Sequence, residues 1–153
     1  MWTDKLEQLH ACEAGVIQAK TSTTLAESFG KSVRGDYMLY LAATFATDKK
    51  DVVRAACAVA EFVDPGSPAI VAVRCWLDGK GPLPRSSLAT KQATQALLAY
   101  ARHVQVDALA PALATSVGIE VVRELVKTGT DRAAAHLRCV AIVRSGVTVV
   151  EDV

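Results

Sequence analysis

Hydrophobic side chains recur every three or four residues along most of this 153-residue chain, which is the spacing of one face of an α-helix. Glycine- and proline-containing stretches separate the periodic segments. The pattern predicts helices over residues 4–19, 25–33, 36–46, 48–63, 68–77, 88–104, 107–127 and 131–144. Gly118 is expected to kink the segment 107–127 or to split it, with 119–127 as the second piece.

The expected helix starts carry side chains that can accept a hydrogen bond from an unpaired backbone N–H. These residues are Thr3, Thr24, Asp36, Thr47 or Asp48, Ser67, Ser87, Asp107 and Thr130 or Asp131. Thr24 and Glu27 have the spacing of a capping box. Pro68 and Pro111 fall in first turns, where proline is tolerated. Gly35 is expected to break the chain just before the helix that Asp36 caps.

Alternating strand patterns do not occur in succession, so the sequence predicts an all-α fold. We expect one domain over residues 1–153, a bundle of about seven to eight helices that could be stacked as helical hairpins. Two sub-bundles, about 1–79 and 86–146, would be joined by the Gly/Pro-rich turn at 79–84. The helix over 48–63 is apolar over more than half of its circumference and is expected to be central.

The C-terminal tail, residues 147–153, has strand propensity. Nothing in the sequence identifies its partner. It could pack down on its own domain, pair with another chain, or fray.

Charge and hydropathy exclude two classes of partner. Seventeen basic and sixteen acidic residues give a net charge of +1, whereas a nucleic-acid binder usually carries a basic excess that neutralises phosphates. No stretch reaches the roughly 18 apolar residues that span a bilayer, and the first residues do not resemble a signal peptide. We therefore expect a cytoplasmic protein that contacts neither nucleic acid nor membrane.

The four cysteines, Cys12, Cys57, Cys75 and Cys139, lie far apart in helix-like apolar surroundings. They are interpreted as small buried thiols in a reducing compartment. The histidines are equally scattered, and no H-E-x-x-H pattern, cysteine pair, phosphate-binding loop or G-x-S-x-G motif is present. The sequence thus predicts no metal site, no cofactor and no catalytic residue, and so a protein that is not an enzyme.

Two short segments combine residue types that are common at interaction sites. Arg34, Asp36, Tyr37 and Tyr40 lie within seven positions, with the two tyrosines on one helix face. Arginine and tyrosine are frequent at binding hot spots because these stiff side chains lose little entropy on binding. Trp76 and Asp78 form the second, smaller group. The alternative is structural: Asp36 caps a helix, and Trp76 belongs to the core.

The order of these motifs resembles that of bacterial all-helical immunity proteins of polymorphic toxin systems. Members commonly show an early Ala-Cys pair, an Arg-Gly-Asp-Trp/Tyr-Met-Leu motif and a Trp-x-x-Gly helix end. The corresponding segments here are Ala11-Cys12, Thr24-Leu25-Ala26-Glu27, Arg34-Gly35-Asp36-Tyr37-Met38-Leu39, Val53-Arg54-Ala55-Ala56-Cys57-Ala58, Trp76-Leu77-Asp78-Gly79 and Val121-Val122-Arg123-Glu124-Leu125-Val126. The resemblance covers residues 5–79 and, loosely, 88–127. The chain departs from the pattern at Pro111 and Gly118, in its few tyrosines and in its extra segment after residue 130.

The resemblance implies a protein that binds and neutralises a cognate toxin without chemistry of its own. Two other functions stay open on the sequence. A pocket between helices could hold a small molecule or an enzymatic site, and the tail could make the chain an oligomeric scaffold. A homodimer is compatible with all three.

Overall fold

The computed structural model describes residues 1–8, 13–104 and 108–150, and over these residues the fold is all-α, as predicted. The helices are α1 (Trp2–Gln8), α2 (Glu13–Ala19), α3 (Leu25–Lys31), α4 (Gly35–Phe45), α5 (Lys49–Ala60), α6 (Pro68–Leu77), α7 (Gln92–His103), α8 (Ala110–Lys127) and α9 (Arg132–Gly146), with a short 3-10 turn, η1 (Ser86–Leu88). Within this part of the chain, no helix has the length and apolar character that a membrane crossing requires.

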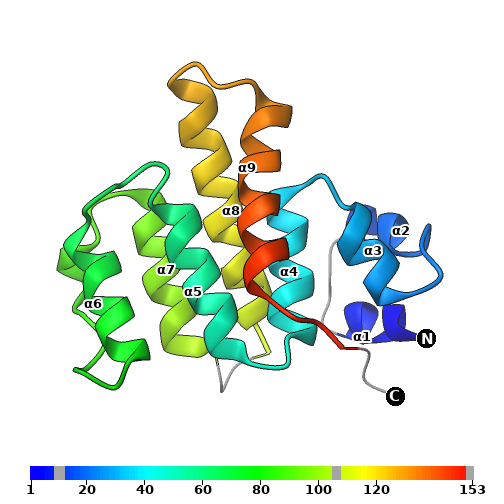
Figure 1. Ribbon diagram of the computed structural model, residues 1–153, viewed down its shortest axis with the longest axis horizontal. Coiled ribbons are helices and arrows are strands. Elements are labelled where there is room, and N and C mark those ends of the chain that lie inside the picture. The colour runs from blue at the N-terminus through cyan, green and yellow to red at the C-terminus, as the bar shows by residue number, and fades with distance from the viewer. Residues whose placement is uncertain (9–12, 105–107, 151–153) are drawn as a thin grey trace.

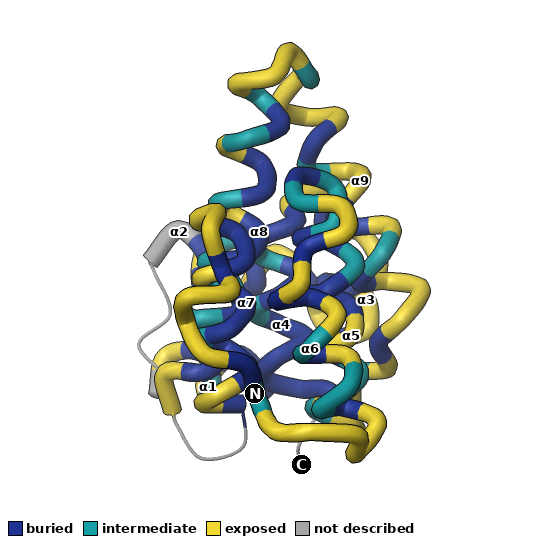
Figure 2. Tube along the Cα trace, turned by 90° about the vertical axis from the view of Figure 1, so that its left-hand side faces the viewer, coloured by how far each residue is buried: buried dark blue, intermediate teal, exposed yellow. Residues whose placement is uncertain are grey.

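Helices α4, α5, α7, α8 and α9 form the body of the molecule. α4 packs along α8 and α9, α7 packs along α8, and α5 contacts α7, α8 and α9. α6 lies at one end of this body, and α1, α2 and α3 lie at the other (Figure 1). The far ends of α8 and α9 stand out from the body and are largely exposed, whereas buried stretches gather in the middle (Figure 2).

Helix α5 is central, as its apolar pattern predicts. Val52, Val53, Ala56, Cys57 and Val59 are fully buried. The chain turns at Asp64–Ser67 and again at Gly79, where φ is +72° and favours glycine. The turn at 79–84 does not divide the core, because α4 and α5 before it pack on α7, α8 and α9 after it.

The N-terminal segment differs from the single helix predicted over 4–19. α1 begins at Trp2, so Thr3 is a buried helical residue and not the N-cap. α2 is a separate helix, and the residues that join the two lie outside the described part of the chain. The two short helices contact opposite ends of α4: Trp2 packs edge-on against Phe45 at 5.9 Å, and Gly15 lies against Tyr37. Each of the two helices thus has its own contact with α4.

Two glycines that were expected to interrupt helices lie inside them. Gly35 is the first residue of α4, and a Cβ built there would lie 2.4 Å from the Cβ of Cys139 in α9. Gly118 lies within the unbroken α8, and its added Cβ would lie 2.9 Å from the Cα of Asp36. Both residues are glycine because helix backbones approach closely there. Asp36 consequently lies in the first turn of α4 and not at its N-cap, which is Arg34.

The predicted start at Ser87 is also wrong. Ser86–Leu88 forms the 3-10 turn, and α7 begins at Gln92. The later start is fixed by contacts with the segment after α5: Lys91 Nζ donates to the carbonyl of Val63 at 2.7 Å, and Thr94 Oγ1 donates to Asp64 Oδ2 at 3.3 Å. The other predicted starts agree within two residues, except that Asp107 lies outside the described residues.

The tail packs on its own chain over residues 147–150. Thr47 N–H donates to the Thr148 carbonyl and Val150 N–H donates to the Phe45 carbonyl, both at 3.0 Å. They flank an isolated antiparallel bridge between Ala46 and Val149. The tail thus extends along the C-terminal end of α4.

The three described cysteines are free thiols. Cys57 and Cys139 are buried as predicted, and burial raises the pKa of each thiol to about 12. Cys75 is only half-buried, which corrects the prediction for that residue, and Cys12 lies outside the described residues. The two buried thiols therefore remain protonated and unreactive at neutral pH.

Candidate functional site

Four of the six predicted site residues surround one cavity. Arg34, Asp36, Tyr37 and Tyr40 line a partly open cavity of about 70 Å³ beside the first two turns of α4. Helices α1, α2, α3 and α8 complete its walls. The remaining lining residues are Leu6, Gly15, Gln18, Ala19, Ser28, Ser32, Leu41 and Thr115.

Arg34 and Asp36 form a two-point ion pair at this cavity. Arg34 Nε lies 3.2 Å from Asp36 Oδ1, and its terminal nitrogen lies 2.7 Å from Oδ2. Two parallel bonds of this kind fix the guanidinium plane as well as its position. The side chain of Asp36 is only 11% exposed, whereas that of Arg34 is 50% exposed. Asp36 therefore positions Arg34, and Arg34 faces solvent.

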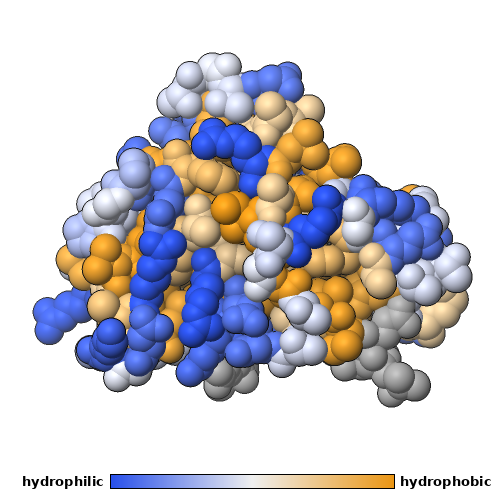
Figure 3. All heavy atoms as spheres, viewed as in Figure 1, coloured by the Kyte–Doolittle hydropathy of each residue, from blue (hydrophilic) through white to orange (hydrophobic). Residues whose placement is uncertain are grey.

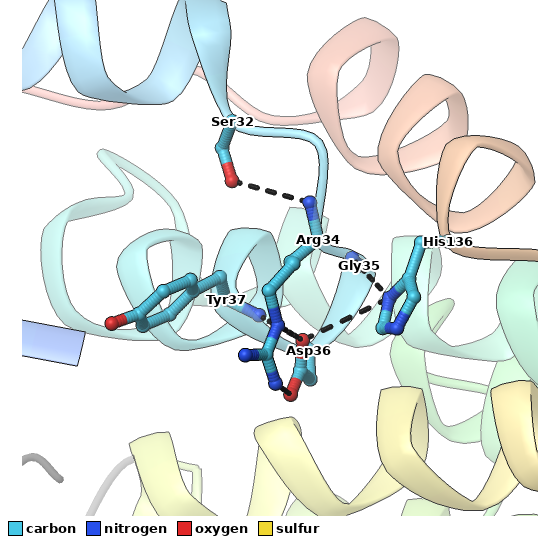
Figure 4. A network of polar contacts seen from close by, with 6 residues as sticks. All are labelled: Ser32, Arg34, Gly35, Asp36, Tyr37 and His136. Carbon is cyan, nitrogen blue, oxygen red and sulfur yellow. Dashed lines mark hydrogen bonds and ion pairs between the residues drawn. The ribbon is translucent and has the colours of Figure 1, made fainter. Parts of the chain in front are cut away.

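Asp36 is held by further contacts within the fold. Its Oδ1 accepts the backbone N–H of Tyr37 at 3.0 Å, and the negative charge lies in the first turn of α4, where the helix dipole favours it. Asp36 lies between Arg34 and His136, and the Tyr37 ring points away from His136 (Figure 4). The carboxylate is thus an anchor of the site.

The Tyr37 ring is fixed from two sides. The guanidinium of Arg34 lies over it, 5.3 Å from the ring centroid, in a cation–π contact. On the other side, a Cβ built on Gly15 would lie 2.4 Å from the Tyr37 hydroxyl oxygen and 2.7 Å from Cε1. Only glycine allows α2 to approach the ring this closely, so Tyr37 forms a rigid wall of the cavity.

His136 of α9 belongs to the same network, although it was not among the predicted site residues. Its Nδ1 accepts the Gly35 N–H at 3.1 Å and lies 3.9 Å from Asp36 Oδ1. Burial lowers the pKa of this imidazole, and the nearby Arg34 and Arg132 lower it further, against the opposing effect of Asp36. His136 satisfies a backbone donor at the start of α4, a role that depends on a contact 101 positions away.

Arg144 ties the segment before α4 to α9. Its guanidinium donates to the carbonyl of Ser32 at 2.8 Å and to that of Phe29 at 3.3 Å. His136 and Arg144 of α9 thus form hydrogen bonds at both ends of the link between α3 and α4. The site residues therefore have a fixed backbone.

Trp76 and Asp78 are not part of this site. They belong to the C-terminal end of α6, which lies at the other end of the molecule from α2 and α3 (Figure 1). Trp76 is partly buried and packs against the core, and Asp78 is the exposed C-cap residue. The structure thus separates the second predicted group from the first, and partner binding by Trp76 and Asp78 stays a prediction.

The arrangement presents a guanidinium and two aromatic rings around an apolar hollow. Within the described ranges, no three His, Cys, Asp or Glu side chains gather so as to hold a metal ion. Larger hollows of about 230, 420 and 430 Å³ occur elsewhere, but they are open grooves with more polar linings. The cavity beside α4 is best suited to receive an apolar group next to the ion-paired guanidinium of Arg34.

No protein-family model, curated protein or solved structure matches the chain.

Proposed function

We propose that the chain is a non-enzymatic protein-binding domain that binds and neutralises a cognate bacterial toxin in the cytoplasm. The observation that carries the proposal is the gathering of Arg34, Asp36, Tyr37 and Tyr40 at one cavity. These residues come from the segment on which the resemblance to immunity proteins is strongest. The free thiols of Cys57, Cys75 and Cys139 fit a reducing compartment.

Neutralisation would work by occlusion. A standard interface buries about 800 Å² on each partner, far more than one cavity offers, so the surrounding surface must take part. The visible face carries hydrophilic side chains interspersed with exposed hydrophobic ones (Figure 3). With a net charge of +1, shape and aromatic anchors would contribute more to recognition than long-range electrostatic steering.

A small-molecule site is the second candidate, and the mostly apolar lining of the cavity favours it. Its size argues against it. Ligand pockets usually measure roughly 300–1,000 Å³, whereas this cavity has a volume of about 70 Å³. A thermal-shift screen with a metabolite panel discriminates the two, because a ligand that strongly raises the melting temperature favours the small-molecule function.

The oligomeric scaffold has lost its main motivation, since residues 147–150 bond to α4 of the same chain. A homodimer stays a prediction. The mass of the purified protein in solution tests it directly.

The test of the proposed function is co-expression with toxin domains encoded beside the gene. We expect a stable complex and survival of cells that express both proteins. Arg34→Ala and Tyr40→Ala should each weaken the complex by about 30-fold, the effect of a hot spot of about 2 kcal/mol. Arg54→Ala is the matched control, because Arg54 is an exposed arginine on α5 that pairs with Asp51.

Folding of the variants must be checked, because Arg34→Ala leaves the buried Asp36 without its ion pair. Equal melting temperatures of Tyr40→Ala and the wild type would separate a loss of binding from a loss of structure. Absence of both complex and protection with every neighbouring toxin domain would reject toxin neutralisation.

A further inference from the structure

The cavity beside α4 has a size and a lining that narrow what can enter it. Resting on the proposed function, we propose that it is a socket for one aliphatic side chain of the protein partner, of the size of valine, isoleucine, leucine or methionine. The partner would place that side chain between Tyr37, Tyr40 and the wall formed by α1 and α2.

Volume sets the upper limit of the occupant. The cavity measures about 70 Å³. An apolar protein cavity of about 150 Å³ holds benzene or xenon. The present space is therefore about half of what an aromatic ring needs, and it fits the end of an aliphatic side chain.

The lining sets the chemistry. Leu6, Ala19 and Leu41 present aliphatic surface, and Tyr37 and Tyr40 add aromatic rings. An occupant without polar atoms leaves no donor or acceptor unpaired when it is buried there. The lining favours a purely hydrocarbon group.

Two of the hydroxyl groups in the lining bond within the fold. Ser32 Oγ accepts the Arg34 N–H at 3.5 Å, and Thr115 Oγ1 donates to the carbonyl of Pro111 at 2.9 Å. Arg34 and Asp36 neutralise each other's charge. A charged side chain would enter without a counter-charge and would have to lose its hydration, so the cavity discriminates against Lys, Arg, Asp and Glu.

The cavity can be reached from outside, as an occupant from a partner molecule requires. Arg34 lines the cavity and has half of its side chain exposed, so the cavity opens next to a solvated guanidinium. Arginine and tyrosine are enriched among the residues that contribute most to protein interfaces. A segment of a partner protein can therefore insert one side chain while its neighbours lie along Arg34 and Tyr40.

The first arm of the test uses xenon and the purified chain alone. Xenon titrated into methyl-labelled protein should shift the methyl signals of Leu6 and Leu41 in a saturable manner. Ala19→Leu, which places a side chain into the space, should abolish the shifts. Ala133→Leu is the matched control, since Ala133 lies exposed on α9 away from the lining, and should leave them unchanged.

The second arm identifies the occupant with a displayed library of random 12-residue peptides selected on the wild-type chain. Enriched peptides should share one Val, Ile, Leu or Met position. Changing that position to Ala, or using Ala19→Leu as the target, should weaken binding at least tenfold, whereas Ala133→Leu should bind as the wild type does. Where Ala19→Leu does not fold, Ala19→Val serves in its place.

The socket proposal would be overturned if xenon caused no shifts or if the selection enriched no peptides. It would also be overturned if the enriched peptides shared an aromatic or charged position, or if they bound Ala19→Leu as tightly as the wild type. These results are separable from the toxin experiment. If Ala19→Leu still protects cells from the toxin, the socket proposal is rejected and toxin neutralisation is retained. If the cavity binds aliphatic peptides but the chain protects against no toxin, the socket is retained and toxin neutralisation is rejected.

Discussion

At the scale of single residues, the imidazole of His136 makes the start of α4 sensitive to pH. Its Nδ1 can accept the Gly35 N–H only while that nitrogen carries no proton. Protonation would place two donors opposite each other, and Asp36 at 3.9 Å would compensate only in part. The pKa of His136 is lowered in the folded state, mainly by burial.

Because the folded-state pKa lies below the unfolded value of about 6.5, the unfolded chain binds the proton more readily. The stabilisation is fully present above the unfolded pKa and is lost as pH falls through 6.5 toward the folded pKa. We expect the free energy of unfolding in urea to fall between pH 7.5 and pH 5.5. His136→Asn keeps an acceptor near the position of Nδ1 and should show a smaller decrease, and an equal decrease in both proteins would contradict the prediction.

Tyr100 illustrates a residue whose polar atom costs stability. Its side chain is fully buried in α7, and among the described residues its hydroxyl has no hydrogen-bond partner. Burial also raises the pKa of this phenol. A buried polar group without a partner costs about 1–3 kcal/mol.

Tyr100→Phe removes that hydroxyl and keeps the ring, so the free energy of unfolding should stay constant or rise by about 1 kcal/mol. Tyr100→Ala, which deletes the ring, should lower it by about 3–5 kcal/mol. Chemical denaturation of the three proteins checks both values. A clear loss of stability in Tyr100→Phe would indicate that the hydroxyl has a partner in solution, such as a buried water.

At the scale of helices, glycine has opposite effects at different positions. Gly118→Ala would bring a Cβ to 2.9 Å from the backbone of Asp36, so α4 and α8 would have to separate, at a cost of about 1–3 kcal/mol. Gly30→Ala in α3 meets nothing within 4 Å and should stabilise the helix by about 0.5–1 kcal/mol. Melting temperatures should therefore move in opposite directions, and a shift of the same sign in both variants would contradict this explanation.

Helix starts could be predicted where the signal is local. Thr24 accepts the Glu27 N–H at 3.1 Å, Asp48 accepts the Lys50 N–H and Asp131 accepts the Ala134 N–H, as their positions suggested. Gly35 and Gly118 could not be interpreted correctly, because their role depends on backbone from other helices. The same holds for Ser87, because the start of α7 at Gln92 depends on contacts with the segment after α5.

The part of the candidate site that could be predicted is the part whose residues lie close together in the sequence. Tyr37 and Tyr40 share a face at helical spacing, and Arg34 and Asp36 are close enough in sequence to pair. The sequence could not supply His136 or Gly15, which reach α4 from other segments. Trp76 was selected for its residue type alone, a criterion that does not distinguish a binding residue from one packed against the core.

At the scale of the whole molecule, stability should be uneven. α1, α2 and α3 have seven residues each, too few to form stable helices on their own in water. They depend on buried side chains, of which Trp2, Leu6, Leu25 and Phe29 are the largest. The body, by contrast, has long helices that pack on several neighbours.

Native-state hydrogen exchange should therefore protect the amides of α5 and α8 most and those of α3 much less. Arg144→Gln weakens the bonds to the Phe29 and Ser32 carbonyls and should accelerate exchange in α3 while leaving α5 unchanged. Arg123→Gln, which alters an exposed pair on α8, serves as the control. Uniform protection across these helices would show that the chain opens only as a unit.

Trp2 and Val150, near the two ends of the described residues, both contact Phe45. The ring of Phe45 packs against Trp2, and its carbonyl accepts the Val150 N–H. A short glycine-serine linker could therefore connect Met1 to Val150, and new termini could be opened within the surface turn at 79–84. Such a circular permutant should keep the native helical spectrum, and it would move fusion tags from the neighbourhood of α4 to the end of the molecule that carries α6.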